Sequence, residues 1–298
     1  MNYLITGAGR GIGRGLTRSL LSSGHRVFLV DNNADELKHT LALAPQWTRG
    51  ETATQTSSTT PRTFKGSIVD LADRAAIKKM VSEVHEFFDG KLDVLVNNAF
   101  PTPHTWADDK RMEDGVDADN EEDESSIMAQ WDRKIAVGLT APFLLSRLCV
   151  PMLVKAGDSS STQGNTKGRG PGCIVNISST RWKQAEDDHE GYSAAKAGLQ
   201  GLTQSLSVSL GHRYGIRVNA ISPGWVHVGE QNMEADKKKT KWEDELAEGD
   251  HKWHPAGRVG GFEDIARTVV FLAESGFVTG QDVVVDGGVG RKMVYPEE

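Results

Sequence analysis

The sequence predicts an α/β fold, in which a doubly wound parallel sheet is flanked by helices on both faces and forms a single domain over residues 1–298. Strand-like and helix-like segments alternate along the chain, which is typical of parallel strands joined by right-handed crossover helices. A glycine-rich turn joins the first strand to the first helix. A length of 298 residues with 38% hydrophobic content is enough to bury one large core.

The first predicted unit is a strand, a tight turn and a helix. Tyr3–Ile5 is apolar and strand-like, and the turn Thr6–Gly13 follows it with the sequence TGAGRGIG. Leu16, Leu20 and Leu21 then recur at helical spacing. Glycines let the backbone of such a turn approach a pyrophosphate closely, and the helix N-terminus supplies N–H groups and a positive partial charge.

The second predicted strand, Val27–Val30, is followed by Asp31, eighteen residues after Gly13. A carboxylate at this place can accept hydrogen bonds from a ribose diol and would repel a 2′-phosphate. The alternative is that Asp31 caps the next helix, which begins near Ala34. With Asp31 at the ribose, NAD(H) is predicted over NADP(H), although Arg10 in the glycine turn could sit beside a 2′-phosphate.

The later elements follow the same alternation. Helix-like segments cover about 72–88, 127–155, 190–212 and 262–273, and strand-like segments lie near 63–69, 92–96, 173–177 and 217–221. Ligands of such sheets bind beyond the carboxyl ends of the strands. Five residues follow predicted strands and are therefore expected to converge at that edge: Asp31, Asp70, Asn98, Ser179 and Pro223.

Tyr192 and Lys196 lie four residues apart in a segment with a helical pattern, so both side chains are expected on one helical face. There the lysine charge is predicted to lower the phenol pKa from about 10 toward neutrality, which would make the tyrosine a usable proton donor or acceptor. Such a group suits carbonyl and alcohol chemistry. The alternative is a surface pair that has this spacing by chance.

Together these residues resemble the short-chain dehydrogenase/reductase family, in its single-domain branch, over residues 2–288. The motifs appear in the family's order: the glycine turn at 6–13, Asp70, Asn97-Asn98-Ala99, Ser179, Tyr192 with Lys196, Pro223-Gly224, and a late stretch at 283–288. The resemblance implies a Rossmann-type sheet. It also implies a reversible hydride transfer between a nicotinamide and a carbonyl or secondary alcohol carbon.

The resemblance also implies roles for single residues. Ser179, Tyr192 and Lys196 would be catalytic: the two hydroxyls would bind the carbonyl oxygen, Tyr192 would act as general acid or base, and Lys196 would hold the nicotinamide ribose. Ser178 is the alternative serine, but its spacing to Tyr192 fits the family less well. The cofactor-binding residues would be Gly7, Arg10, Gly11, Ile12, Gly13, Asp31, Asp70, Asn98, Ala99, Tyr192, Lys196, Pro223, Gly224 and Val226.

Three positions depart from the family pattern. The fourth catalytic position, usually Asn, aligns with Gly138; Phe100 replaces the glycine that usually closes the Asn-Asn-Ala motif; and Val228 replaces a threonine that usually follows Pro-Gly. Gly138 is expected to weaken turnover without abolishing it, so Gly138→Asn should raise it. The alternative function is a non-catalytic NAD-binding sensor or scaffold with an incomplete tetrad.

Three stretches without periodicity, about 49–62, 108–125 and 156–172, are expected to be inserted surface loops. The second contains ten Asp and Glu residues against Lys110 and Arg111, a net charge of −8, so it carries the acidity of the chain. It is expected to be a solvated excursion; the alternative is a docking surface for a basic partner or a gate beside the substrate. The polar stretch 229–254 is expected to form a substrate lid.

Composition favours a cytoplasmic enzyme without nucleic-acid or membrane partners, because the rest of the chain is nearly neutral and no apolar run is expected to reach the ~18 residues of a membrane span. The first strand begins at once, which leaves no room for a signal peptide. Cys149 and Cys173 are too few for a disulfide framework and are expected as buried thiols. His251 and His254 are expected in a solvated loop, so no metal site is predicted.

The expected partner is a small alcohol or carbonyl substrate, whose identity the sequence does not specify. Four side chains in regions where the family builds its pocket are candidates for contacting it: Trp106, Arg181, Trp182 and Trp225. A homodimer or homotetramer is implied by the resemblance alone.

Overall fold

The computed structural model describes residues 1–48, 63–114, 125–157 and 171–293. Their strands form one parallel sheet in the order β3-β2-β1-β4-β5-β6-β7. The strands are β1 (Asn2–Thr6), β2 (Arg26–Asp31), β3 (Phe64–Ile68), β4 (Val94–Asn97), β5 (Cys173–Ile177), β6 (Arg217–Pro223) and β7 (Asp282–Val285). The winding direction reverses between β1 and β4, so the predicted doubly wound, Rossmann-type sheet is confirmed.

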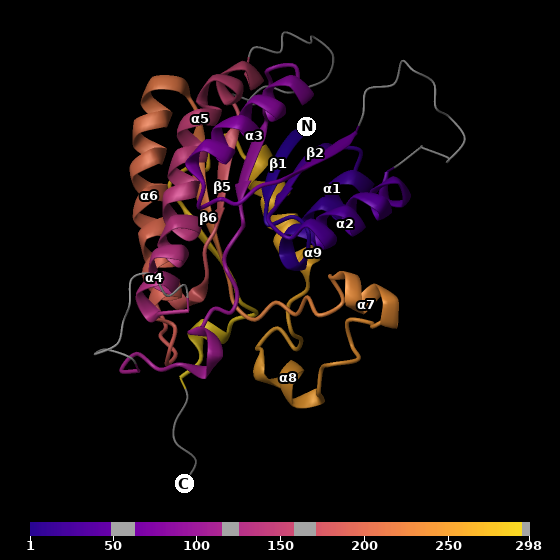
Figure 1. Ribbon diagram of the computed structural model, residues 1–298, viewed down its shortest axis with the longest axis vertical. Coiled ribbons are helices and arrows are strands. Elements are labelled where there is room, and N and C mark those ends of the chain that lie inside the picture. The colour runs from indigo at the N-terminus through magenta and orange to yellow at the C-terminus, as the bar shows by residue number, and fades with distance from the viewer. Residues whose placement is uncertain (49–62, 115–124, 158–170, 294–298) are drawn as a thin grey trace.

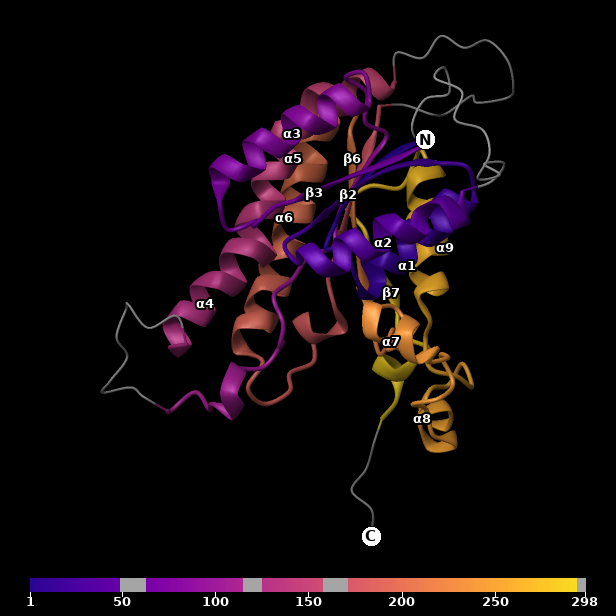
Figure 2. The ribbon, with the colours of Figure 1, turned by 45° about the vertical axis from the view of Figure 1, so that its right-hand side comes forward.

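Helices cover both faces of this sheet. The α-helices are α1 (Gly11–Ser22), α2 (Ala34–Trp47), α3 (Arg74–Phe87), α4 (Ile127–Ile135), α5 (Ala141–Ala156), α6 (Glu190–Tyr214), α7 (Met233–Lys238), α8 (Glu248–Trp253) and α9 (Phe262–Glu274). Figures 1 and 2 show α1, α2 and α9 on one face and α3, α4, α5 and α6 on the other. The short helices α7 and α8 lie beyond one end of the sheet.

Along each central strand, alternate side chains lie in two separate hydrophobic cores, one on each face of the sheet. In β1, Tyr3 and Ile5 pack with α1 and α9, whereas Leu4 lies in the core on the opposite face, and all three are 0% exposed. β2 repeats this pattern with Leu29 in the first core and Phe28 in the second. A parallel strand that is buried on both faces has a continuous run of apolar residues. This run is why the sequence predicted these strands.

The long helix expected over 127–155 is interrupted near its middle. A π-helical turn, η2 (Ala136–Thr140), separates α4 from α5 and contains the buried residue Gly138. A π-helical turn widens the helix locally, and such turns are frequent at functional sites. Position 138, where the family usually has asparagine, is glycine, so the π-helical turn forms here without an asparagine side chain.

Among the described residues, one helical run, Ile127–Ala156, is long and apolar enough to cross a membrane by length and composition. The expectation that no segment would reach this length is therefore wrong. Leu145, Cys149 and Met152 of this run are at most 2% exposed and pack in the core beside α3. Its apolar character is that of a core helix.

The three expected insertions lie wholly or largely outside the described residues. This holds for all of 49–62, for 115–124 within the acidic stretch, and for 158–170. Cys149 and Cys173 are both buried free thiols, as expected. Burial raises the pKa of the Cys149 thiol to about 12, so this thiol is unreactive at neutral pH.

Candidate active site

A cavity of about 1080 Å³ opens at the carboxyl ends of the strands. It is lined by residues that follow β1, β2, β3, β4, β5 and β6, the convergence that the sequence predicted. Every predicted catalytic and cofactor-binding residue lines this cavity except Gly13. A volume of this size exceeds what one drug-sized ligand usually needs, so it can hold a dinucleotide together with a small substrate.

The glycine turn is built for close approach of backbone. Gly7 and Gly11 have φ angles of +65° and +59°, which favour glycine, and α1 begins at Gly11. A Cβ atom on Gly13 would lie 2.0 Å from the carbonyl oxygen of Gly7, so only glycine fits there. Gly13 therefore supports the turn from behind instead of lining the cavity.

Asn98 ties the end of β4 to this turn. Its side-chain Nδ2 donates to the carbonyl oxygens of Thr6 at 2.9 Å and Gly7 at 3.1 Å. The backbone N–H groups of Asn98 and Ala99 both donate to Oγ1 of Thr6, at 3.0 and 3.1 Å. The turn and the strand end are thus held as one rigid wall of the cavity.

Asp31 lies against the glycine turn and does not cap the next helix. Its Oδ2 accepts a hydrogen bond from Gly9 N at 2.8 Å, and its Oδ1 accepts one from Asn33 N at 2.9 Å. The N-cap of α2 is Asn33, whose side chain accepts from Asp35 N and Glu36 N. This geometry decides against the capping alternative and leaves the carboxylate fixed at the cavity wall. The guanidinium of Arg10 donates to Thr102 Oγ1 at 2.5 Å.

Asp70 has a partner that sequence reasoning missed. Arg133 of α4 donates to Asp70 Oδ2 at 2.8 Å, and Ala72 N donates to Oδ1 at 2.9 Å. Burial acts to raise the pKa of Asp70, but these hydrogen bonds and the charge of Arg133 outweigh it and lower the pKa below its usual value. Arg133 also lines the cavity. Arg133 and Asp70 are 63 residues apart in the sequence, so no local sequence pattern indicated this contact.

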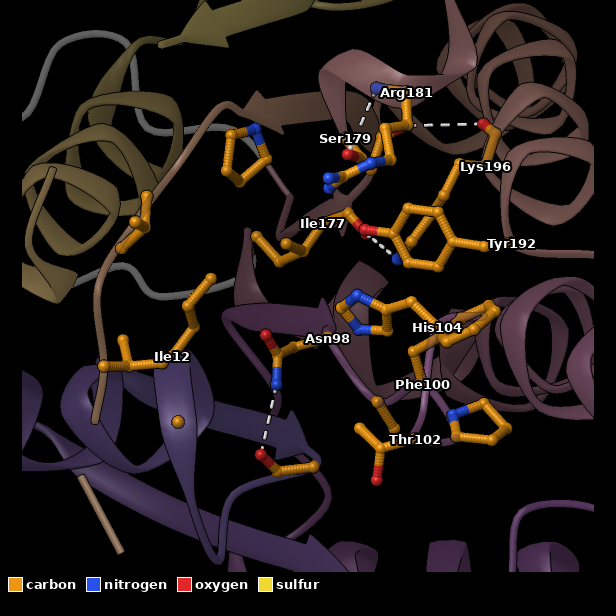
Figure 3. Close-up of a pocket in the computed structure, with 18 of the residues that line it drawn as sticks. Ile12, Asn98, Phe100, Thr102, His104, Ile177, Ser179, Arg181, Tyr192 and Lys196 are labelled. Atoms are coloured by element: carbon orange, nitrogen blue, oxygen red, sulfur yellow. Dashed lines mark hydrogen bonds between the residues drawn. The ribbon is translucent and has the colours of Figure 1, made fainter. Parts of the chain in front are cut away.

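Ser179, Tyr192 and Lys196 are brought together at the cavity wall and are 5%, 6% and 3% exposed (Figure 3). Ser179 follows β5, and Tyr192 and Lys196 occupy one face at the start of α6. The hydroxyl of Ser179 accepts a hydrogen bond from Arg181 N at 3.2 Å and lies close enough to the phenol of Tyr192 to lower its pKa. Ser178 instead turns its hydroxyl to the backbone carbonyl of Lys196 at 3.3 Å and is 2% exposed, which is a structural role.

The pKa of Tyr192 moves opposite to the expectation. Burial raises it, while the nearby Ser179 hydroxyl and the charge of Arg181 lower it by less. The reason is the position of the ammonium group of Lys196. It donates to the carbonyl oxygen of Ile177 at 2.8 Å and lies over the tyrosine ring, 5.5 Å from the ring centroid. Burial also lowers the pKa of Lys196 to about 7, which reduces its charge near neutral pH.

Two further rings surround Tyr192, and neither role was predicted. His104 stacks on it with ring centroids 4.4 Å apart, and Phe100 meets it edge-on at 4.8 Å. Burial of one face of the His104 ring, together with the positive charges of Lys196 and Arg181, lowers the pKa of this histidine well below its usual range. The imidazole is therefore neutral at pH 7.

The candidate substrate side chains divide into two groups. Arg181 and Trp225 line the cavity, and Arg181 is paired with Glu186. Trp106 and Trp182 do not line it, because their indole N–H groups donate to other elements: Trp106 to Glu190 at 3.0 Å and Trp182 to Asp282 at 3.2 Å. Val228 lies against the glycine turn at the cavity wall.

The stretch 229–254 contains α7 and α8, and its first half is docked on the cofactor side of the fold. Arg14 of α1, only 3% exposed, forms an ion pair with Asp236 of α7 at 2.5 Å. The carbonyl of Gln231 accepts from Gly11 N at 2.8 Å, so the segment crosses directly over the start of α1. Its action as a substrate lid stays a prediction.

His254 corrects another expectation. It is 2% exposed and its Nδ1 is 2.8 Å from the carbonyl oxygen of Asp250, so it does not lie in a solvated loop. The ring packs against Trp225 and Gly287, which is why it is buried. Among the residues that the structure describes, no group of His, Cys, Asp and Glu side chains could hold a metal ion.

The buried ammonium of Lys196 gives a testable pH dependence. Unfolding exposes it to water, where its pKa is about 10.4, so the folded state binds fewer protons between pH 7 and that value. The cost of burying the charge is fully present below pH 7 and is relieved as the pH rises. In urea unfolding, Lys196→Met should gain stability relative to wild type most at pH 6–7 and progressively less toward pH 9.5.

The matched control is Lys78→Met, which removes an exposed lysine of α3 and should show a difference that does not change with pH. A pH-independent difference for Lys196→Met as well would contradict burial of the charge.

Comparisons with known proteins identify the family of this chain. The family model described as enoyl-(acyl carrier protein) reductase matches residues 7–290. An uncharacterized oxidoreductase from Thermotoga maritima is 36% identical over 99% of this chain and 97% of that protein. A (3R)-3-hydroxyacyl-CoA dehydrogenase from Mus musculus is 30% identical over 96% of this chain and 95% of that protein. The structure of an apo SCOR enzyme from Clostridium thermocellum is 30% identical, covers 98% of this chain and 94% of that chain, and has a TM-score of 0.71. The chain belongs to the short-chain dehydrogenase/reductase family of oxidoreductases.

Proposed function

We propose that this oxidoreductase interconverts a carbonyl and a secondary alcohol, with Tyr192 as the general acid or base and NAD(H) as the preferred nicotinamide cofactor. The observation that carries the proposal is the grouping of three buried side chains, Ser179, Tyr192 and Lys196, on the wall of a cavity that also contains the glycine turn. Cofactor chemistry and substrate chemistry are thus brought within one cavity.

The residues present fit a dinucleotide. The start of α1, the positive φ angles of Gly7 and Gly11 and the space kept free by Gly13 form a cradle in which a side chain at position 13 would collide with backbone. Asp31 and Asp70 stand at the ends of β2 and β3, where a ribose and a base would lie. When bound, the nicotinamide supplies or accepts the hydride.

The two hydroxyls are placed to act on one oxygen atom. Ser179 and Tyr192 can both donate hydrogen bonds to a carbonyl oxygen, and fixed donors are effective where negative charge develops. Burial raises the pKa of Tyr192, so the phenol carries its proton at neutral pH and is ready to donate it. Reduction of a carbonyl is therefore favoured at neutral pH, and alcohol oxidation should be favoured as the pH rises. Lys196 would hold the ribose hydroxyls.

The substrate is proposed as a small alcohol or carbonyl compound bound near Arg181, Trp225 and His104, which line the cavity beyond Tyr192. The names of two relatives place their chemistry at C3 of an acyl thioester: the mouse 3-hydroxyacyl-CoA dehydrogenase and a 3-oxoacyl-(acyl carrier protein) reductase from Thermotoga maritima. A screen for this chain therefore includes 3-oxoacyl thioesters beside polar hydroxy ketones. A cytoplasmic homodimer or homotetramer, with 229–254 as lid, completes the proposal.

Tyr192→Phe tests the general acid. It deletes the hydroxyl while keeping the ring that packs against Phe100 and His104. Turnover should fall at least about 100-fold, the range expected for losing a general acid, with the dissociation constant for NADH nearly unchanged. Tyr214→Phe, at the exposed end of the same helix, is the control. Retention of more than about a tenth of wild-type turnover would assign the acid to another group.

Asp31→Asn tests cofactor choice. It removes the charge that opposes a 2′-phosphate but keeps an oxygen that can accept from Gly9 N. The ratio of dissociation constants for NADPH and NADH, measured by fluorescence titration, should shift at least about tenfold toward NADPH, or about 1.4 kcal/mol. Asp35→Asn, in the first turn of α2, is the control. Wild-type protein that binds NADPH more tightly than NADH would overturn the proposed preference.

A further inference from the structure

Phe100 stands at the centre of the catalytic group although it comes from the loop after β4. Its ring meets Tyr192 edge-on, with centroids 4.8 Å apart and an interplanar angle of 78°. The Nζ atom of Lys196 lies over the same ring, 5.0 Å from its centroid. One side chain thus contacts both residues of the Tyr192–Lys196 pair (Figure 3).

The space that Phe100 occupies is available only because residue 138 is glycine. A Cβ atom on Gly138 would lie 2.6 Å from Cε2 and 2.9 Å from Cδ2 of Phe100, and 3.1 Å from Cβ of Ala195. Contacts under 3.0 Å with an aromatic ring in a packed site require the ring to move. A side chain at position 138 would therefore displace the ring of Phe100 from its present place. Phe100 and Gly138, which both depart from the family pattern and lie 38 residues apart in the sequence, therefore pack directly against each other.

The ammonium of Lys196 needs the support that this ring offers. Its hydrogen bond to the carbonyl oxygen of Ile177, at 2.8 Å, uses one of three N–H groups. The face of an aromatic ring attracts a cation, and most strongly where water is excluded, as it is around a side chain that is 3% exposed. The carbonyl and the ring together fix where the ammonium lies relative to Tyr192.

We propose that Phe100 is a positioning residue of this active site: its ring holds the Lys196 ammonium and the Tyr192 phenol in place, and Gly138 is the position that gives the ring room. A side chain at position 138 would begin within the volume that the ring fills. This inference rests on the proposed roles of Tyr192 and Lys196. The other charged and titratable groups that face the pair are His104, Arg181, Glu186 and His189.

The exclusion of one side chain by the other is tested with a double-mutant cycle. Gly138→Asn alone should lower kcat/KM at least about tenfold, because the new side chain displaces the ring; this replaces the earlier expectation that it would raise turnover. Phe100→Gly alone should also lower kcat/KM. The double variant Phe100→Gly with Gly138→Asn should recover to within about threefold of wild type, since the amide then has the vacated space. If the fold-losses of kcat/KM in the two single variants simply multiply in the double variant, the two side chains do not compete for the same space and the inference is overturned.

The positioning role is tested with Phe100→Leu, which keeps an apolar side chain but removes the aromatic face. Loss of a cation-binding face should lower the apparent pKa of Lys196 in the pH profile of kcat/KM by about half a unit or more, and lower kcat more than it changes KM. Phe271→Leu, at an exposed position of α9, is the control. An unchanged pH profile and kcat in Phe100→Leu would overturn the inference.

Failure of this inference is distinguishable from failure of the proposed function. If Tyr192→Phe is inactive while the Phe100 and Gly138 variants behave like wild type, only the positioning role is lost. If Tyr192→Phe remains active, the proposed function fails. Thermal melting of every variant, with NADH binding measured in parallel, separates loss of folding from loss of positioning.

Discussion

The burial of one ammonium group, that of Lys196, is the constraint on which the rest of the site depends. A charge taken out of water must be given partners, and the partners here come from different parts of the chain: the Ile177 carbonyl at the end of β5 and the ring of Phe100 after β4. Because both strand ends must meet the first turns of α6, the position of Tyr192 is fixed as well. The arrangement of Tyr192 and Lys196 at the cavity wall follows from meeting this electrostatic need.

The sheet supplies the rigidity that such an arrangement requires. Below the site, the buried amide of Asn97 in β4 donates to Asn176 of β5 at 2.8 Å, and Asn176 donates to Thr203 of α6 at 2.9 Å. This chain of hydrogen bonds links β4, whose following loop carries Phe100, to β5 with Ile177 and to α6 with Lys196. These two hydrogen bonds fix the relative positions of the three elements, since breaking either one would leave a buried polar group without its partner. The cofactor side is held separately, through Asn98 and the glycine turn.

Patterns local in the sequence predicted the fold, and all but one of the catalytic and cofactor-binding residues that they predicted line the cavity. The glycine turn, Asp31, Ser179 and Tyr192 each sit within or directly after one element, so periodicity and spacing were enough to place them. Contacts between distant segments were not predictable in this way. The Phe100 ring against Gly138, Arg133 on Asp70 and Gln231 over Gly11 join segments that share no local pattern. The direction of the Tyr192 pKa shift was wrong for a related reason: the spacing of four residues indicates a shared face, but not that the lysine amine reaches past the phenol to Ile177.

The ionisation of Lys196 tests this account most directly. Protein labelled with ¹³C at lysine Cε can be titrated by NMR, with Lys196→Met used to assign the signal. Burial, which lowers the pKa of Lys196 to about 7, predicts one lysine signal that titrates near neutral pH in the protein without cofactor, well separated from the exposed lysines. A Lys196 signal that titrates near 10.4 with the others would contradict the account, because the ammonium would then be solvated and would impose no order on the residues around it.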